Sequence, residues 1–208
     1  MISAIILAAG RSRRMGVQKL LLPFGGRTVI GHIAGEVLRS PVDRTIVVVG
    51  EDGDRIAEVL GGCRLTLVAN ADPDADMLSS VRCGLRALLP DCEAVLVALG
   101  DQPTLTANLV GRMIDAFRTA GRGIVVPVYG GKPGHPILFP ARYRDEVLTR
   151  YDGVGLRGLP QAHPEDVFDL NVTSPAVLAD MDCPEDYRRE LARLRPDSPP
   201  QVQENDLA

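Results

Sequence analysis

The sequence predicts an α/β fold, a three-layer α/β/α sandwich around a mostly parallel sheet. Apolar runs rich in Val, Ile and Leu recur along the chain, and several are unbroken rather than alternating. Unbroken runs are typical of strands buried on both faces. Between them, apolar residues recur at four-residue spacing, which is typical of helices with one buried side. Repeated alternation of the two patterns predicts parallel strands joined by helices.

Each element follows from one of these two patterns. The expected strands span 3–8, 45–49, 65–69, 94–99, 124–128 and 167–170. The expected helical stripes are Val29, Ile33 and Val37, then Val81, Leu85 and Leu89, then Leu109, Met113 and Phe117. Ligands of such folds bind beyond the carboxyl ends of the strands. The site is therefore expected in the loops 9–19, 70–79, 100–105 and 129–136.

Length and charge limit the class of protein. The 208 residues fit one domain, expected over 1–195, and the polar, proline-rich segment 196–208 is expected to be a disordered tail. The chain has 23 basic and 27 acidic residues, and three of the acids lie in that tail. A body with a charge near −1 argues against nucleic-acid binding. No apolar run is long enough for a membrane span, and no signal sequence is evident, so we expect a cytoplasmic protein.

The loop after the first strand combines small residues with positive charge. Gly10 allows backbone N–H groups to approach a ligand, and three arginines with Lys19 add cationic donors. This composition predicts a cradle for phosphate groups. It is neither a Walker A loop, since five residues separate Gly10 from Gly16 and Leu20 follows Lys19, nor a G-x-G-x-x-G dinucleotide loop.

An aspartate follows the expected strand 94–99. Asp101 lies in the turn Gly100-Asp101-Gln102-Pro103, at the strand's carboxyl end. This position suits a Mg²⁺ ligand. It also suits an ordinary turn residue, because Asp-x-Pro is common turn chemistry.

The first loop also carries a specific resemblance. The run L-A-A-G-R-S-R-R-M-G-x-x-K over 7–19 resembles the signature of the nucleotidyltransferases that modify the molybdenum cofactor. The A-A-G form resembles the cytidylyltransferase branch. The resemblance implies a Rossmann-like nucleotidyltransferase fold. It also implies transfer of CMP from CTP to the terminal phosphate of molybdopterin, with release of pyrophosphate.

Two acidic segments extend the resemblance to a metal. Leu99-Gly100-Asp101-Gln102-Pro103 resembles the family's L-x-D-Q-P segment, which implies that Asp101 is the principal Mg²⁺ ligand. The segment 180–186 resembles D-I-D-T-P-E-D, with Cys183 in place of threonine. In the family, an acid of this segment binds the same metal. The resemblance therefore implies that either Asp180 or Asp182 is the second ligand, and we prefer Asp182. Asp182 also suits the N-cap of a helix starting nearby.

Two further segments imply substrate contacts. Residues 76–85 resemble G-M-S-S-S-L-R-A-G-L, with matches at Ser79, Ser80 and Arg82 but Asp76 in place of glycine. Ser79 also suits a helix N-cap. The loop Gly134-His135-Pro136 resembles the family's G-H-P form, which favours the cytidylyl branch and implies binding of the acceptor substrate. Residues 152–157 loosely resemble the family's D-x-G-x-R segment, which lies near the substrate.

The resemblance thus assigns roles to particular residues. Arg14, Lys19 and Asp101 are expected to be catalytic. The expected nucleotide contacts are Leu7, Ala8, Ala9, Gly10, Arg11, Ser12, Arg14, Lys19, Ser80 and Arg82. The expected partners are CTP or GTP, a molybdopterin-type acceptor, and a molybdoenzyme or its maturation chaperone.

Three other functions stay open at this point. The first is the same chemistry with GTP or another phosphate acceptor. The second is a non-catalytic carrier of the molybdenum cofactor, which the paired acids disfavour because a carrier needs no metal on a nucleotide phosphate. The third is a dinucleotide-binding oxidoreductase, which the missing glycine fingerprint disfavours.

Overall fold

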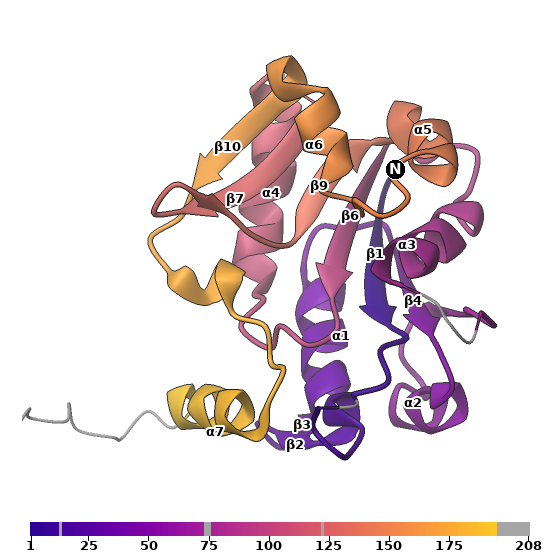
Figure 1. Ribbon diagram of the computed structural model, residues 1–208, viewed down its shortest axis with the longest axis vertical. Helices are drawn as coiled ribbons and strands as arrows, with labels where there is room; N and C mark the ends of the chain where they lie inside the picture. Colours follow the sequence, from indigo (N-terminus) through magenta and orange to yellow (C-terminus); the bar gives the residue numbers. More distant parts are fainter. Residues whose placement is uncertain (13, 73–75, 122, 195–208) are drawn as a thin grey trace, which may run out of the picture.

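The computed structural model describes residues 1–12, 14–72, 76–121 and 123–194 and confirms the three-layer α/β/α arrangement (Figure 1). Within these ranges eight strands form one sheet, with the order β10-β7-β9-β6-β1-β4-β5 and with β8 paired to β7. Their bounds are β1 (Ile2–Ala8), β4 (Arg44–Val49), β5 (Thr66–Ala69), β6 (Ala94–Leu99), β7 (Ile124–Tyr129), β8 (Lys132–Pro133), β9 (Ile137–Pro140) and β10 (Val167–Asn171). The expected tail, 196–208, lies outside the described residues.

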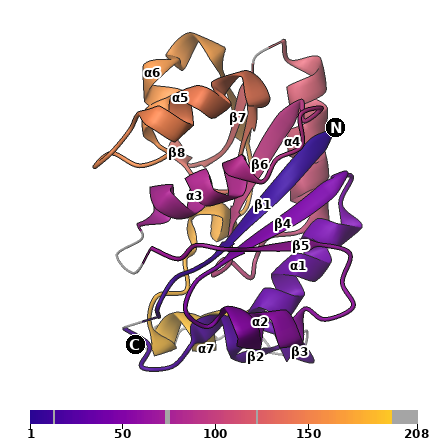
Figure 2. The ribbon, with the colours of Figure 1, turned by 90° about the vertical axis from the view of Figure 1, so that its right-hand side faces the viewer.

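Helices cover both faces of the sheet, as the edge-on view in Figure 2 shows. One face carries α1 (Val29–Arg39) and α4 (Ala107–Thr119), and the other carries α3 (Met77–Arg86), α5 (Arg144–Thr149) and α6 (Gly158–Ala162). The remaining elements are α2 (Gly53–Val59), α7 (Pro184–Arg193) and the two-stranded hairpin of β2 (Pro23–Phe24) and β3 (Arg27–Thr28). None of the described helices is both long and apolar enough to cross a membrane.

The central strand β1 explains why its apolar run is unbroken. Successive side chains of a strand point to opposite faces. Ile6 packs into the core under α1 and α4, whereas Ile5 packs into the core under α3 and α6. Both side chains are fully buried, so both faces of the strand require apolar residues here.

The sheet is parallel around β1 and mixed further out. β1 pairs in parallel with β4 and β6, and β10 pairs in parallel with β7. The sequence pattern did not predict the two-residue strands β2, β3 and β8, nor β9, which lies between β6 and β7 and is antiparallel to both. Four apolar residues directly after a loop carry too little periodicity to identify a strand.

The predicted helical stripes are confirmed with one exception. Val81 and Leu85 are buried on α3, but that helix ends at Arg86, and Leu89 is 44% exposed. The stripe overshoots because its spacing continues into the turn that precedes Pro90, where the chain is no longer helical.

We predict that Gly84→Ala destabilises the protein by about 1–3 kcal/mol, because it overpacks the core. A Cβ at Gly84 would lie 2.6 Å from Ile5 Cγ2, and Ile5 is fully buried in β1. The matched control is Gly111→Ala on α4, whose Cβ would meet nothing closer than Pro41 Cδ at 3.8 Å. This control should gain about 0.5–1 kcal/mol from helix propensity. Urea denaturation measures both, and equal effects of the two substitutions would contradict this packing.

Candidate active site

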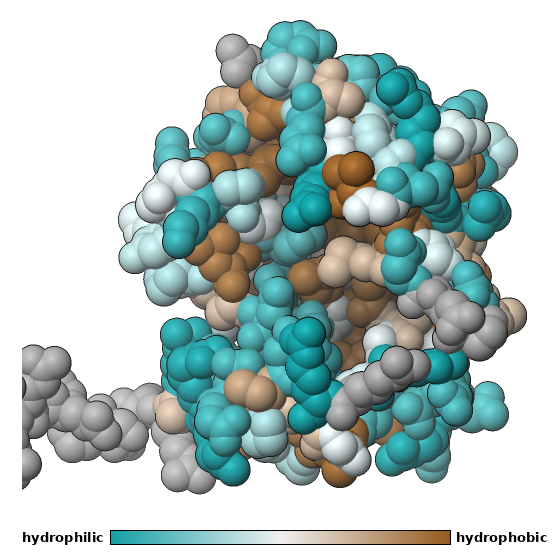
Figure 3. All heavy atoms as spheres, in the orientation of Figure 1, coloured by the Kyte–Doolittle hydropathy of each residue, from teal (hydrophilic) through white to brown (hydrophobic). Residues whose placement is uncertain are grey.

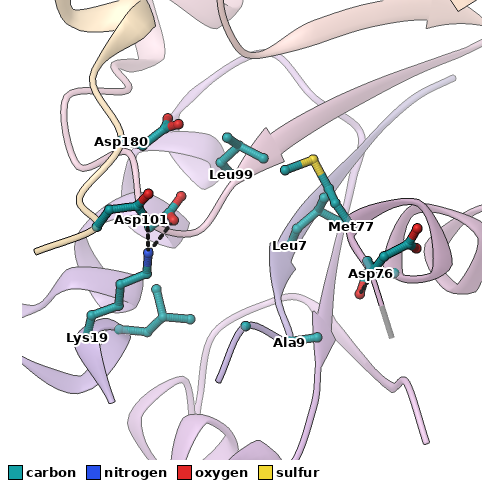
Figure 4. A pocket seen from close by; sticks show the side chains of 12 residues that line it. Leu7, Ala9, Lys19, Asp76, Met77, Leu99, Asp101 and Asp180 are labelled. Atoms are coloured by element: carbon teal, nitrogen blue, oxygen red, sulfur yellow. Dashed lines mark hydrogen bonds and ion pairs between the residues drawn. The ribbon is translucent and has the colours of Figure 1, made fainter. Parts of the chain in front are cut away.

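A cleft of about 270 Å³ opens at the carboxyl ends of β1 and β6. Four segments distant in sequence meet there: the first loop, the start of α3, the turn after β6, and the segment before α7 (Figure 4). The residues that line it are Leu7, Ala9, Gly10, Lys19, Leu20, Asp76, Met77, Ser80, Leu99, Asp101, Asp180 and Asp182. The site therefore lies where parallel strands of an open sheet place their ligands.

The first loop is held in shape by its own polar side chains. Ser12 has a left-handed backbone (φ +50°), its Oγ donates to Gln18 Oε1 at 2.8 Å, and it accepts from the Lys19 amide at 3.1 Å. Gln18 Nε2 in turn donates to Asp52 Oδ2 at 2.7 Å. These bonds fix the backbone of Lys19, so the lysine side chain has a defined starting point.

Lys19 joins two of the predicted acids. Its Nζ donates to Asp101 Oδ2 at 2.6 Å and to Asp182 Oδ1 at 3.1 Å, as the dashed lines in Figure 4 mark. The lysine side chain is only 10% exposed. Arg14 approaches the same cluster from the solvent side, where its guanidinium donates to Asp182 Oδ2 at 3.0 Å. Two cations and two carboxylates therefore share one corner of the cleft.

The charge of Lys19 is secured by this arrangement. Burial would by itself lower the pKa of Lys19, but attraction to Asp101 and the bonds to both carboxylates outweigh it, and the pKa is raised. The ammonium group consequently stays charged throughout the neutral range.

Backbone bonds bring the two acidic segments together. The Met181 amide donates to the Asp101 carbonyl at 3.1 Å, and the Met181 side chain is fully buried. Asp186 accepts from the amides of Asp182 and Cys183 and closes a capping box at the start of α7. The N-cap of α7 is thus Cys183, not Asp182, so the Asp182 carboxylate is available to the cleft.

Asp180 lines the same cleft but has a different partner. Its Oδ1 accepts from Gln102 Nε2 at 2.6 Å. Burial raises the pKa of Asp180, although the Gln102 bond opposes this shift. Asp182, by contrast, faces Asp101 across Lys19. The two candidate acids therefore differ in their contacts: Asp182 shares Lys19 with Asp101, whereas Asp180 is bonded to Gln102.

A close backbone approach places Asp101. Gly100 donates to the Leu7 carbonyl at 2.9 Å, and a Cβ at position 100 would lie 2.5 Å from the same oxygen. Only glycine fits this contact between the ends of β6 and β1. Asp101, the next residue, is thereby held beside the first loop.

The carboxylates of Asp101 and Asp182 suit a divalent cation. Mg²⁺ prefers oxygen ligands and is usually held by one or two carboxylates together with substrate phosphates. Among the described residues no group of three or more His, Cys, Asp or Glu side chains is arranged as a complete metal site. Asp101 and Asp182 have oxygens 2.6 and 3.1 Å from the Lys19 ammonium nitrogen. They fit a site in which two carboxylates hold Mg²⁺ together with substrate phosphates.

Half of the predicted nucleotide contacts line the cleft. Leu7, Ala9, Gly10, Lys19 and Ser80 line the cleft. Three others lie at its margin or behind it: Ser12 supports the loop, Arg11 pairs with Glu51 at 3.5 Å, and the Ala8 side chain is buried in the core.

Arg82 is not part of this cleft. Its guanidinium donates to the carbonyls of Val147 and Arg150 at 3.0 and 2.8 Å, and to Asp152 Oδ1 at 2.7 Å. Val147 lies in the last turn of α5, and Arg150 and Asp152 lie just beyond its end. Arg82 thus anchors the loop 150–157, which walls a different cavity.

The predicted acceptor loop borders that second cavity. Gly134 and His135 line it, whereas Pro136 does not. The Gly134 amide donates to the Pro127 carbonyl at 2.8 Å. A Cβ at position 134 would lie 2.3 Å from the Val177 carbonyl oxygen, so only glycine fits. Burial lowers the pKa of His135, partly opposed by Asp180 and Asp101, which favours a neutral ring.

Two features of the cleft were missed by the sequence interpretation. Met77 lines both cavities and so connects them. Asp76, not Ser79, is the N-cap of α3, since its Oδ1 accepts from the Ser79 amide at 2.7 Å. An aspartate just before a helical stripe is an N-cap signal that could have shown this.

Comparisons with known proteins identify a matching family and two relatives that align along most of the chain. The family model of the MobA-like NTP transferase domain matches residues 4–167. The chain is 29% identical over 187 residues to the molybdenum cofactor cytidylyltransferase of Escherichia coli (strain K12), covering 89% of this chain and 93% of that protein. It is also 29% identical over 199 residues to the nicotine blue oxidoreductase of Paenarthrobacter nicotinovorans, covering 91% and 96% of the two chains.

Solved structures give the same fold. A nucleotidyl transferase from Methanothermobacter thermautotroptrophicus superimposes with a TM-score of 0.81 at 29% identity, covering 93% of this chain and 97% of that chain. A protein of Mycobacterium tuberculosis H37Rv in complex with manganese superimposes with a TM-score of 0.73 at 25% identity, covering 92% and 98%.

We predict that Arg82→Met increases amide hydrogen exchange in the loop 150–157 by about tenfold or more, because charge-assisted bonds to its backbone are lost. The control is Arg86→Met, an exposed residue on the same helix. If amide exchange in this loop is unchanged and the variant binds CTP more weakly, Arg82 is a nucleotide-binding residue and not an anchor of the loop.

Proposed function

Because the chain belongs to the MobA-like NTP transferase domain family, we propose that this nucleotidyltransferase transfers CMP from CTP to the terminal phosphate of molybdopterin, releasing pyrophosphate. The observation that carries the proposal is the meeting of Lys19, Asp101 and Asp182 in one cleft beside a glycine-containing loop. The likeness to a molybdenum cofactor cytidylyltransferase along most of both chains supports the choice of substrates.

The reaction must overcome repulsion between its own substrates. A nucleoside triphosphate and a phosphate monoester are both anions, and two unit charges 4 Å apart repel by about 4 kcal/mol at an effective dielectric near 20. A bound Mg²⁺ supplies charge neutralisation for the phosphates and for the leaving pyrophosphate. Asp101 and Asp182 would hold it, and the manganese complex of a structural relative supports a divalent metal.

The other residues of the cleft position and neutralise the triphosphate. The backbone around Gly10 offers N–H donors at the end of β1, and Lys19 and Arg14 provide positive charge. The acceptor's phosphate oxygen forms a bond to the α-phosphorus while the bond from that phosphorus to the β-phosphate oxygen breaks. No side-chain nucleophile is needed, because the attacking phosphate is already ionised. Catalysis then rests on positioning and electrostatic stabilisation.

Cytidine is preferred on the basis of two motifs. The Ala8-Ala9-Gly10 run and the Gly134-His135-Pro136 loop both resemble the cytidylyl branch. Guanylyl transfer, and transfer to another phosphate acceptor, are the nearest alternatives. We expect a molybdoenzyme or its maturation chaperone to receive the product.

The likeness to a nicotine blue oxidoreductase makes a redox activity the competing function of another class. Two acids that flank a cation in a cleft at the carboxyl ends of β1 and β6 suit triphosphate chemistry better than hydride transfer, which needs no such cluster. A non-catalytic carrier of the cofactor would likewise have no use for it.

We predict that Asp101→Asn lowers the rate of pyrophosphate release by at least about a hundredfold, because several kcal/mol of charge stabilisation are lost. The substitution keeps the size of the side chain, so the melting temperature checks that the fold persists. If the folded variant turns over nearly as fast as the wild type, Asp101 is not a metal ligand.

We further predict that Asp182→Asn weakens Mn²⁺ binding by about ten- to a hundredfold and that Asp180→Asn weakens it less. The reason is that Asp182 faces Asp101 across a cation, whereas Asp180 is bonded to Gln102. Electron paramagnetic resonance of free Mn²⁺ measures both affinities. The reverse order would assign the second ligand to Asp180.

A substrate panel tests the proposed reaction directly. Each of CTP, GTP, ATP and UTP is mixed with the full chain, Mg²⁺ and molybdopterin, and pyrophosphate is measured. We expect the fastest release with CTP. Release in a parallel mixture of CTP with a sugar phosphate, but not with molybdopterin, would identify a different acceptor. Hydride transfer from NADH or NADPH to an added electron-accepting dye, without pyrophosphate release in any mixture, would favour the oxidoreductase.

A further inference from the structure

A second and larger cavity, of about 750 Å³, lies beside the candidate active site on the face of the sheet that carries α3 and α6. Met77 belongs to the walls of both cavities, so the two are neighbours. Figure 3 shows apolar side chains gathered around a hollow in this face of the molecule. A ligand that spans both cavities would have one end among the charges of the cleft and the other end here.

The lining of this cavity is mainly apolar. The apolar side chains that the argument uses are Val126, Ile137, Val154, Leu156, Pro160 and Val167. Val126, Ile137 and Val167 come from the neighbouring strands β7, β9 and β10, and Val126 and Ile137 also belong to the core under α3. A surface of aliphatic side chains above a sheet suits the face of a flat ring.

One carboxylate interrupts this apolar floor. Asp169 lies two residues after Val167 on β10, so the two side chains are on the same face of the strand. It is also in register with Val126 of β7, which lines the cavity too. The sheet therefore presents Asp169 to the cavity rather than to the opposite core.

Asp169 has no partner within the described part of the chain, and neither has the guanidinium of Arg157 or the amide of Gln161, which line the same cavity. In particular, no ion pair within 4 Å joins Asp169 to Arg157, although their charges are opposite. A carboxylate, an amide and a guanidinium that border one apolar cavity without bonding each other form an exposed polar rim. Their groups are available to a ligand.

We propose that Asp169 is a specificity-determining residue that recognises the pterin ring of the acceptor. A pterin carries an exocyclic amine next to a ring N–H, and these two parallel donors match the two oxygens of a carboxylate. The flat ring lies against the aliphatic floor, while its phosphate arm extends past Met77 to the cleft. This inference rests on the proposed function, because it places the acceptor of that reaction.

Asp169→Asn tests the proposal, since an amide keeps the size but offers only one acceptor and loses the charge. The control is Asp115→Asn, an exposed acid on α4 that covers the opposite face of the sheet. The probes are free pterin and lumazine, which has oxygen in place of the exocyclic amine. Binding is measured by the fluorescence of the probe, in a protein that contains no tryptophan.

We expect the wild type and Asp115→Asn to bind pterin more tightly than lumazine, and Asp169→Asn to lose this preference by about ten- to a hundredfold. In turnover, Asp169→Asn should raise the KM for molybdopterin with the KM for CTP unchanged. A merely structural role would not change the preference between the two rings.

The two proposals fail separately. If no acceptor is turned over with any triphosphate, the proposed function fails, while the ring preference still decides the role of Asp169. If the wild type does not distinguish pterin from lumazine, or Asp169→Asn distinguishes them as well as the wild type does, the inference is overturned even when molybdopterin is a substrate.

Discussion

The ion cluster of Lys19 with Asp101 and Asp182 is the contact on which the site depends. The lysine is separated by 82 residues from the first acid and by 163 from the second. Its side chain is nearly buried, and an unpaired buried ammonium costs several kcal/mol. The first loop, the turn after β6 and the segment before α7 must therefore meet for the lysine to remain charged there. The same geometry places two cationic side chains and two carboxylates together in one cleft.

The sheet makes this meeting possible. β1 lies between β4 and β6, and all three are parallel, so their carboxyl ends reach the same edge. Gly100 allows the end of β6 to approach the Leu7 carbonyl, and Met181 anchors the segment before α7 both through its buried side chain and through its bond to the Asp101 backbone. Rigid strand ends thus support a site that is itself made of loops, as is common for binding sites.

The two cavities differ because different parts of the fold build them. Loop ends and their charges make the smaller cleft, while the faces of β7, β9 and β10 make the larger, mainly apolar one. Met77 joins them. Arg82 contributes from a distance by holding the loop beyond α5, which forms part of the second wall. A charged cleft next to an apolar cavity suits an acceptor with a phosphate at one end and a ring at the other.

The sequence alone determined the layered α/β fold, the main strands and the loops that carry the site, because periodicity and turn residues are local properties. It also singled out Asp101, Lys19 and the 180–186 segment, because carboxylates suit a metal ion and a lysine suits phosphate groups. Only the tertiary structure decided their partners: antiparallel β9, the anchoring role of Arg82, the place of Asp182 opposite Asp101, and the position of Asp169 in an apolar cavity. These depend on contacts between residues far apart in the chain, which no local pattern encodes.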